Sequence, residues 1–411
     1  MAHLHVRRPA ALVALLALLA VLALGAAACG GSDDTAAPAE PAPAKPAAPA
    51  PAEPAPAEPA PAEPAPAEPT PAESAPAEPA PSEPAPAESA PADTAGGTDQ
   101  VKPGLRLAFF SVGGNNTYLK AGIKGAEDAA KAYGATIQVF NGEFDGAKQL
   151  NQVMGAIASG DFDGFVLEAN NPQQLCSAAK ATLEAGIVLA VTNVPVCDAP
   201  YDGAYEGTTI FVGGQSPEVY TQWFTQGLES ADGGEFAVLN GPAVHGNTTR
   251  AREVLDGLKG NYPGWKEVAF DATEYQASVA LTKTENILNK NPNINVIFSS
   301  YSGHTSGIIS AVKAAGKLDQ VKIYDLGGDQ TMFEALKNGE IASTEIFLPY
   351  EEQYRAVQSV VAKLSGLDEL EGVPSTGTFW DLCKDPKLQG LPCFLTADKI
   401  ADYEAIGLPE Y

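Results

Sequence analysis

The fold of this chain is decided by residues 105–140, which read LRLAFFSVGGNNTYLKAGIKGAEDAAKAYGATIQVF. The apolar opening, residues 105–112, predicts a buried strand. Residues 118–133 carry apolar side chains at helical spacing, and Gly134 ends that pattern. Residues 137–140 predict the next strand. The stretch is therefore a strand–helix–strand unit.

The same alternation continues along the chain. Further strands are predicted at residues 165–168, 188–192, 235–240, 268–271, 296–299 and 321–325, and further helices around 150–157 and at 174–185, 248–258, 278–288 and 306–315. Repeated strand–helix units form parallel sheets that helices cover on both faces. The pattern occurs twice, and the roughly 310 residues from Gly104 onward exceed one comfortable core. We therefore expect an α/β fold with two similar Rossmann-like lobes.

The start of the chain is typical of an export signal. Arg7 and Arg8 supply a positive charge, and residues 10–28 are a nearly unbroken run of Ala, Leu and Val. Small residues directly precede Cys29, which resembles the bacterial lipoprotein signal, although Ala26 replaces the usual Leu. The alternative is ordinary cleavage that releases a secreted chain. We expect residues 1–28 to be a signal peptide and Cys29 to carry a lipid anchor.

Residues 29–103 form a linker rich in Pro, Ala and Glu. Variants of a Pro-Ala-Glu-Pro-Ala unit repeat from Pro51 onward, and residues 38–95 contain no large apolar side chain that would build a core. Frequent Pro favours extended polyproline II, in which residues 44–95 would span ~160 Å. This composition predicts a spacer that holds a domain away from a membrane. The alternative is a solubilising tail.

The charge and the histidine content exclude several classes of function. The formal net charge is −26, and residues 30–100 hold nine Glu and four Asp against one Lys. Such a chain, without clusters of Lys and Arg, is a poor nucleic-acid binder. Only His245 and His304 lie beyond the signal segment, and neither a G-x-S-x-G nor a G-x-G-x-x-G motif occurs. We expect no cofactor, no metal and no catalytic residue.

The cysteines fit an oxidising compartment. If Cys29 carries lipid, the remaining four are Cys176, Cys197, Cys383 and Cys393. Four cysteines allow three pairings, and their order favours two local pairs, Cys176–Cys197 and Cys383–Cys393. No C-x-x-C motif occurs, which argues against a zinc ribbon or a redox site.

The residues that follow the predicted strands indicate a ligand. In open parallel sheets, ligands bind beyond the carboxyl ends of the strands. Those positions are rich in Asn, Tyr and Asp, with one Arg and without a nucleophile–base pair: residues 113–118, 170–172, 193–194, 245–250, 273–275, 300–304 and 325–329. Amides donate and accept hydrogen bonds, and Tyr rings stack on the apolar face of a sugar. The set suits a neutral polyhydroxy ligand.

Three features then resemble one family. Residues 115–119, Asn-Asn-Thr-Tyr-Leu, are similar to an Asn-Asn-Pro-Phe-Phe stretch, residues 149–171 match a helix, strand and Asn-Pro pattern, and Arg250 follows a Gly-Pro strand end. These are features of the bacterial periplasmic sugar-binding proteins of the ribose-binding type, which are type 1 solute-binding proteins of ABC transporters. The resemblance covers nearly all of residues 104–364.

The resemblance implies binding roles for particular residues. Together with the strand-end positions, it gives an expected ligand-binding set of Asn116, Tyr118, Asn171, Asn193, Arg250, Tyr275, Tyr301, Asp325 and Phe347. Asp329 is the alternative to Asp325, because the chain between them is longer than usual. Asn193, Tyr301 and Phe347 depart from the residues of ribose binders and make the pocket more aromatic and less charged.

Each of these residues also has a purely structural alternative. Asn116 is a good helix cap and Asn171 a good turn residue. Arg250 reads equally as a surface arginine at a helix start, and Asp325 as a strand-end carboxylate paired with a lysine. The tyrosines alternatively belong to the rim or the core.

The resemblance also implies an architecture of the periplasmic-binding-protein type 1, with three hinge crossovers. We expect an N-terminal lobe formed by residues 104–209 and 349–375, a C-terminal lobe formed by 210–348, and a tail at 376–411 that returns across the hinge.

The expected function is that of an extracytoplasmic solute-binding lipoprotein. It would capture a small polar ligand, a monosaccharide first of all, and deliver it to an ABC-type permease, as a monomer on the outer face of the membrane or in the periplasm. A binding protein for a nucleoside or another aromatic molecule, a sensory receptor and an exported α/β enzyme are the alternatives. The missing acid–base pair argues against the enzyme.

Overall fold

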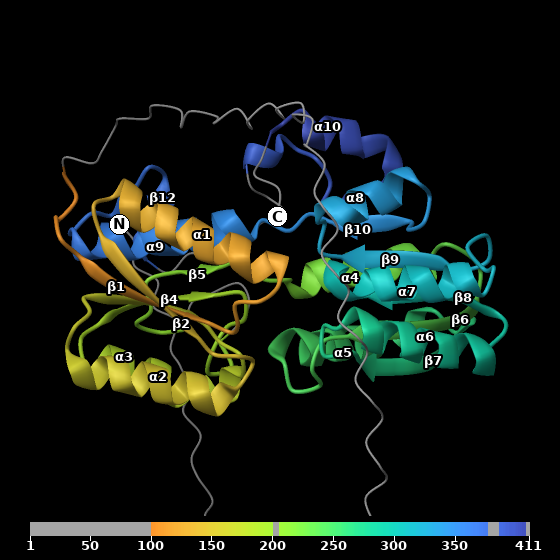
Figure 1. Ribbon diagram of the computed structural model, residues 1–411, viewed down its shortest axis with the longest axis horizontal. Helices are drawn as coiled ribbons and strands as arrows, with labels where there is room; N and C mark the ends of the chain where they lie inside the picture. The colour runs from red at the N-terminus through yellow and green to blue at the C-terminus, as the bar shows by residue number, and fades with distance from the viewer. Residues whose placement is uncertain (1–99, 200–204, 377–385, 408–411) are drawn as a thin grey trace, which may run out of the picture. The chain divides into compact units, whose positions relative to one another are not determined.

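A computed structural model describes residues 100–199, 205–376 and 386–407 (Figure 1). The expected signal peptide, Cys29, almost all of the linker, and Cys383 lie outside the described residues.

The first lobe contains a five-stranded parallel sheet. Its strands, in the order β2-β1-β3-β4-β5, are β1 Arg106–Ser111, β2 Thr136–Asn141, β3 Gly164–Glu168, β4 Val188–Thr192 and β5 Phe211–Val212. The helices α1 Thr117–Ala132 and α9 Pro349–Leu364 cover one face (Figure 1). The helices α2 Gly146–Ser159 and α3 Pro172–Glu184 cover the other.

The second lobe contains a six-stranded sheet in the order β13-β10-β9-β8-β6-β7. Its strands are β6 Gly234–Asn240, β7 Trp265–Ala272, β8 Ile294–Ser299, β9 Lys322–Leu326, β10 Ser343–Glu345 and β13 Phe394–Leu395, of which only β13 runs antiparallel to its neighbour. The helices α4 Pro217–Leu228 and α5 Gly246–Leu258 cover one face. The helices α6 Ala277–Lys290, α7 Ser302–Ala314 and α8 Gln330–Lys337 cover the other.

Short elements complete the two lobes. The hairpin β11 Glu369–Leu370 and β12 Val373–Pro374 packs on the first lobe through Leu370 and Val373. The short helix α10 Ile400–Glu404 packs on the second lobe, where the rings of Tyr403 and Phe333 lie 5.1 Å apart. Three 3-10 turns are η2 Lys259–Asn261, η4 Pro386–Leu388 and η5 Ala397–Lys399.

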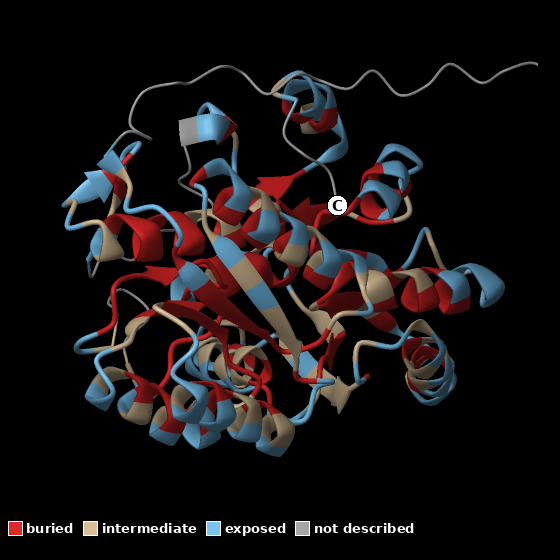
Figure 2. Cartoon of the chain, turned by 60° about the vertical axis from the view of Figure 1, so that its left-hand side comes forward, coloured by how far each residue is buried: buried red, intermediate tan, exposed pale blue. Residues whose placement is uncertain are grey.

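Each inner strand is apolar on both faces because helices cover both sides of its sheet. In β1, Phe109 packs under α1 and α9, whereas the adjacent Phe110 packs under α2 and α3. Figure 2 shows the interior strands mostly buried and the outward sides of the helices exposed. The two-sided apolar pattern that predicted parallel sheets therefore corresponds to their burial.

The chain crosses between the lobes three times, as expected. It leaves the first lobe after β5, returns between β10 and α9, and reaches the second lobe again before β13. The expected boundaries need two corrections. Residues 211–212 belong to the first sheet and not to the second lobe, because they pair with β4. The tail does more than recross the hinge, because β13 extends the second sheet.

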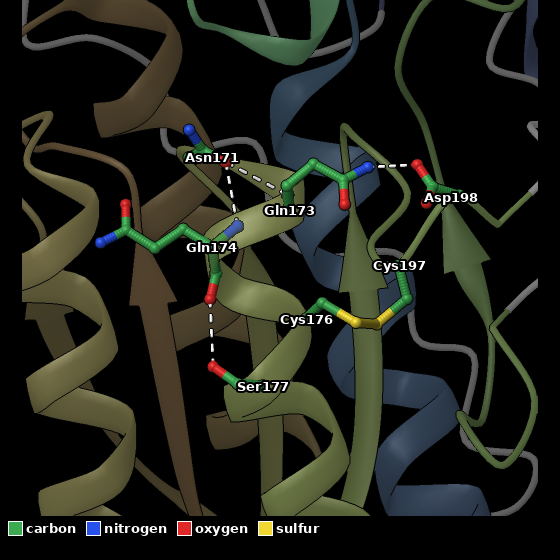
Figure 3. Close-up of a disulfide and its surroundings, with 7 residues drawn as sticks. All are labelled: Asn171, Gln173, Gln174, Cys176, Ser177, Cys197 and Asp198. Carbon is green, nitrogen blue, oxygen red and sulfur yellow. Dashed lines mark hydrogen bonds between the residues drawn. A yellow bond between two sulfur atoms is a disulfide. The ribbon is translucent and has the colours of Figure 1, made fainter. Parts of the chain in front are cut away.

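The expected Cys176–Cys197 disulfide is confirmed. It joins α3 to the loop after β4, close to the Asn171 cap and to the hydrogen bond between Gln173 and Asp198 (Figure 3). The second expected pair includes Cys383 and is not tested by the described residues.

Within residues 100–199, 205–376 and 386–407, no helix combines the length and the apolar character that crossing a bilayer requires.

Candidate functional site

A cavity lies where the carboxyl ends of strands from both sheets meet. Its lining is formed by Val112, Asn116, Tyr118, Leu119, Phe144, Glu168, Asn193, Gln215, Tyr220, Asn240, His245, Asn247, Thr248, Tyr275, Ser300, Tyr301 and Phe347. This is the position that the rule for parallel sheets predicts for a ligand. The lining mixes aromatic rings, amides and hydroxyls with one carboxylate.

The cavity is small. It offers about 60 Å³ of space to the centres of water-sized molecules. One buried water needs roughly 10–15 Å³ on this measure, so the cavity admits a handful of water-sized groups. Its size therefore suits a small ligand better than a large one.

A chain of hydrogen bonds runs from the second lobe into the first. Asn247 Nδ2 on α5 donates to Asn193 Oδ1 at 3.0 Å, and Asn193 Nδ2 donates to Tyr118 Oη at 2.8 Å. Tyr118 Oη donates in turn to Glu352 Oε2 at 2.7 Å. Glu352 lies on α9 next to the first crossing, where a Cβ at Gly213 would lie 2.4 Å from its Cδ. The network thus connects the cavity with a hinge segment.

Glu168 supplies the carboxylate of the lining. It is the last residue of β3, and its Oε2 accepts hydrogen bonds from Ser111 Oγ at 3.0 Å and from Val112 N at 3.3 Å. Burial raises the pKa of Glu168 to about 7. Burial, followed by the charge of Glu168, also raises the pKa of Glu352 well above its ordinary value. Two buried carboxyl groups therefore lie close together on the first-lobe side.

The cavity lining includes two buried polar atoms of the second lobe that have no hydrogen-bond partner in the described part of the chain. They are Asn240 Nδ2, at the end of β6, and Ser300 Oγ, directly after β8. Asn240 is only 1% exposed, so bulk solvent does not supply a partner for its Nδ2. A buried donor without a partner costs roughly 1–3 kcal/mol. Both atoms belong to cavity-lining residues, where a bound ligand would satisfy them.

Aromatic rings form a large part of the walls. Tyr275 and Tyr301 lie edge to face with ring centres 5.3 Å apart, and Tyr118 and Phe347 do so at 5.7 Å. Phe144 from the first lobe lies 6.4 Å from Tyr275 of the second. A Cβ at position 241 would lie 2.0 Å from Tyr275 Cζ, so only glycine fits beneath this ring.

Three residues of the lining have left-handed backbone conformations. The φ angles are 57° for Phe144, 63° for Asn193 and 55° for Tyr275. Such conformations cost a non-glycine residue roughly 1–3 kcal/mol and cluster at ligand sites. Here they place the rings of Phe144 and Tyr275 and the amide of Asn193 around one cavity.

His245 lines the cavity as a neutral side chain. Burial lowers its pKa to about 4. Its Nδ1 accepts from Asn247 N at 3.3 Å, at the start of α5. In the described residues no group of three or more His, Cys, Asp or Glu side chains is arranged to hold a metal ion.

The structure brings together six residues of the expected set: Asn116, Tyr118, Asn193, Tyr275, Tyr301 and Phe347. Asn116 also caps α1, because its Oδ1 accepts from Leu119 N at 2.8 Å. The structural alternative and the lining position thus coexist at this residue.

Asn171 and Arg250 do not lie on this cavity. They line a separate hollow of about 410 Å³ between α3 and α5. Asn171 caps α3 by accepting from Gln173 N and Gln174 N at 3.1 and 3.0 Å, and Arg250 pairs with Glu253 at 2.9 Å. Arg250 thus matches its alternative of a helix-start arginine, whereas Asn171 is a helix cap and not the turn residue expected as its alternative.

Asp325 and Asp329 do not line the cavity either. Asp325 is fully buried and accepts hydrogen bonds from Ser302 Oγ at 3.1 Å, from Thr344 Oγ1 at 2.6 Å and from Thr305 Oγ1. Asp329 caps α8 by accepting from Met332 N at 2.9 Å. Both carboxylates have their partners inside the second lobe.

Several lining residues were not in the expected set, notably Phe144, Glu168, Asn240 and Ser300. Glu168 and Asn240 share a signal that the sequence does carry. Each is a polar residue that ends an otherwise apolar strand. Phe144 lies in the turn between β2 and α2, and no pattern marks it.

Comparison with known proteins identifies relatives. The profile of the family described as "Periplasmic binding protein domain" matches residues 107–368, more than half of the chain. The D-ribose/D-allose-binding protein of Pseudomonas aeruginosa is 27% identical over 263 residues, which are 60% of this chain and 77% of that protein.

Solved structures share the fold. A solute-binding protein of an ABC transporter from Agrobacterium vitis, with bound D-fucose, has a TM-score of 0.63 and 21% identity over 74% of this chain and 99% of that one. A periplasmic solute-binding protein from Actinobacillus succinogenes, with bound D-allose, has a TM-score of 0.59 and 22% identity over 74% of this chain and 100% of that one. At these identities the likeness is one of fold.

Proposed function

This chain belongs to the periplasmic binding protein family, and on that premise we propose that it captures a monosaccharide in the cavity between its lobes. As a member of this family it is an extracytoplasmic binding protein and not an enzyme. The proposed ligand-binding residues are those of the cavity lining: Asn116, Tyr118, Asn193, Tyr275, Tyr301 and Phe347, together with Asn240 and Ser300. Asn171, Arg250 and Asp325 lie away from this cavity.

The observation that carries the proposal is the pair of unpartnered polar atoms, Asn240 Nδ2 and Ser300 Oγ. They lie at the carboxyl ends of two strands of one sheet, where ligands bind in parallel α/β folds. A hydroxyl group of a sugar both donates and accepts, so it can satisfy an amide donor and a serine hydroxyl together. The rings of Tyr275 and Phe347 offer apolar surface to the C–H face of a sugar.

The size of the cavity favours a monosaccharide over a nucleoside. The space of about 60 Å³ for water-sized centres is limited, so a single sugar ring fits it better than a sugar with a base attached. The relatives agree with this choice, because the names of two of them include ribose, allose and apiose.

Delivery to an ABC-type permease follows from the family. The two lobes would close on the ligand by hinge motion at the three crossings, and the Asn247–Asn193 bond spans the closed lobes. Acylation at Cys29, with residues 30–103 as the spacer, would keep the monomeric binding domain near its permease.

The test is a thermal-shift screen of the purified full chain against neutral pentoses, hexoses and polyols, with nucleosides as the contrast. A ligand at 100 times its dissociation constant adds about 2.7 kcal/mol of stability. We expect a shift with at least one sugar, because ligand binding satisfies groups that the free protein leaves unpaired. A shift with nucleosides alone would contradict the proposal.

A matched pair of variants locates the site. Ser300→Ala should weaken binding of the selected sugar about fivefold, which corresponds to about 1 kcal/mol for one lost hydrogen bond. Ser310→Ala is the control, because its exposed hydroxyl donates to Ser306 O within α7. Equal affinities for both variants in calorimetry would remove Ser300 from the site.

The anchor has its own test. Labelled fatty acid should be incorporated into the wild-type chain in a bacterial host, and Cys29→Ala should abolish the label and release the protein from membranes. Membrane association that persists without Cys29 would argue for another anchor.

A further inference from the structure

The cavity lining has an unusual charge. It contains the carboxylate of Glu168 and, among its described residues, neither Lys nor Arg. Arg250, the arginine that the resemblance offered as a ligand contact, lies in the separate hollow and pairs with Glu253. The ligand therefore faces a negative group where a guanidinium had been expected.

A second buried carboxyl group, that of Glu352, lies close to the first. Glu352 is buried behind the lining and accepts from Tyr118 Oη at 2.7 Å. In the part of the chain that the structure describes, neither Glu168 nor Glu352 forms an ion pair with Lys, Arg or His. Burying a carboxylate without a counter-charge is costly, so a cation that enters the cavity gains the attraction that the protein itself does not use.

Glu168 has an oxygen available for such a cation. Both of its hydrogen bonds, from Ser111 Oγ and Val112 N, end on Oε2. Oε1 accepts no hydrogen bond from the described residues, and the side chain belongs to the cavity lining. The buried and unpartnered Asn240 Nδ2, on the same cavity, independently marks this space as one that a ligand fills.

The walls suit a positive charge as well. Tyr118, Phe144, Tyr275, Tyr301 and Phe347 present their rings to the same cavity. Aromatic rings attract an ammonium group by their quadrupoles, most strongly where water is excluded. His245, the imidazole of the lining, brings no competing charge, because burial lowers its pKa to about 4.

We propose that the ligand of this cavity carries a protonated amine that binds against Glu168 Oε1, and that the ligand is an amino sugar. The inference rests on the proposed function, since Asn240 and Ser300, which would pair with the sugar hydroxyls, belong to the proposed sugar site. The amine pairs with Glu168 while the ring hydroxyls meet Asn240 and Ser300.

The experiment compares sugars that differ only at the amine. Titration calorimetry of the full chain at pH 7.5 would use D-glucosamine against D-glucose, D-galactosamine against D-galactose, and the N-acetyl derivatives as uncharged amides of similar shape. We expect the preferred amine to bind at least tenfold more tightly than its neutral partner and its N-acetyl derivative.

Variants assign the effect to Glu168. Glu168→Gln keeps the acceptor for Ser111 and Val112 but removes the charge, so it should lower the ratio of amine affinity to neutral-sugar affinity at least tenfold. Glu143→Gln removes an equal charge from the exposed turn beside Phe144 and should leave both affinities unchanged. If Glu168→Gln fails to fold, the matched sugars on the wild-type chain decide alone.

The outcomes separate the two proposals. Neutral sugars that bind as tightly as their amines overturn the amino-sugar inference and leave the sugar-binding function standing. Binding of choline without binding of any sugar supports a cation site but overturns both the sugar assignment and the amino-sugar inference. Silence with every sugar, amine and choline also overturns both.

Discussion

Glu168 in the first lobe and Asp325 in the second are both buried carboxylates near the end of a strand, and the two are satisfied differently. Asp325 in β9 of the second lobe accepts from three hydroxyl groups, those of Ser302, Thr305 and Thr344. Glu168 in β3 of the first lobe accepts from one hydroxyl and one amide, both on the same oxygen. Burial raises the pKa of each to about 7.

The difference separates a structural carboxylate from one that is available to a ligand. Asp325 has used both oxygens inside its own lobe and does not line the cavity. Glu168 lines the cavity with one oxygen unused. A raised pKa therefore does not distinguish the two roles, whereas the count of internal donors does.

The largest effect is expected from removing Asp325, the structural carboxylate of the two. Asp325→Ala leaves three hydroxyl groups without their acceptor, and we expect the free energy of unfolding to fall by about 4 kcal/mol. Urea denaturation measures this change. Asp319→Ala, at an exposed position, is the control and should stay within about 0.5 kcal/mol of the wild type. A loss at position 325 no larger than the control would reject the structural role.

The next effect is the pH dependence that Glu168 contributes. Its pKa rises on folding from 4.5 to about 7, so the folded chain keeps a proton that the unfolded chain has lost. This contribution to stability is fully present below pH 4.5 and is lost as the pH rises through about 7. Between pH 4.5 and 8, the wild type should therefore lose about 3 kcal/mol relative to Glu168→Gln.

This comparison also has an internal control. Asp325 titrates in the same range but is common to both chains, so its contribution cancels. Glu352 and Tyr118 are the titratable groups that face Glu168, and His245 lines the same cavity from the second lobe. Parallel stability curves for wild type and Glu168→Gln would show that Glu168 does not keep its proton on folding.

A smaller effect is expected where the lobes meet. Asn247→Ala removes the donor to Asn193, which is the first hydrogen bond of the series that runs through Tyr118 to Glu352. One hydrogen bond of about 1 kcal/mol corresponds to roughly fivefold weaker sugar binding. Calorimetry measures the affinity, and unchanged binding would mean that this bond does not contribute to the closed, ligand-bound form.

The smallest effect is expected at Arg250, which lies outside the cavity. Arg250→Ala removes a partly exposed ion pair with Glu253, and such pairs are worth about 0–1 kcal/mol. We expect the affinity for the selected sugar to change by about twofold or less. A tenfold loss would return Arg250 to the ligand-binding set.

The fold was largely predictable because its signals are local. The strand β4 was predicted at the residues it occupies, 188–192, since four apolar residues and a polar end mark it. The two-residue strand β5 was missed, because so short a pairing leaves no periodic pattern. Helix α4 was also missed, although Ser216 caps it and Pro217 begins it.

The candidate site was predictable only in part. The strand-end rule found Asn193 and Tyr275, because it depends on topology alone. The rule does not tell which polar residues find partners inside the protein, as Asp325 and the Asn171 cap do. That depends on side chains from distant segments, such as Thr344 for Asp325, and the sequence around each residue does not contain them.

The order in which the chain is made has a consequence for the three crossings. Helix α9 covers a sheet whose last strand ends at Val212, and β13 completes a sheet that begins at Gly234. Neither lobe is built from one continuous segment, so the first core is incomplete until α9 has emerged and the second until β13 has. A chain that reaches the far side of a membrane N-terminus first must therefore wait, with its apolar strands uncovered, for its own end. The yield of folded protein would therefore depend on how quickly the chain is translocated and on whether a chaperone covers the exposed strands meanwhile.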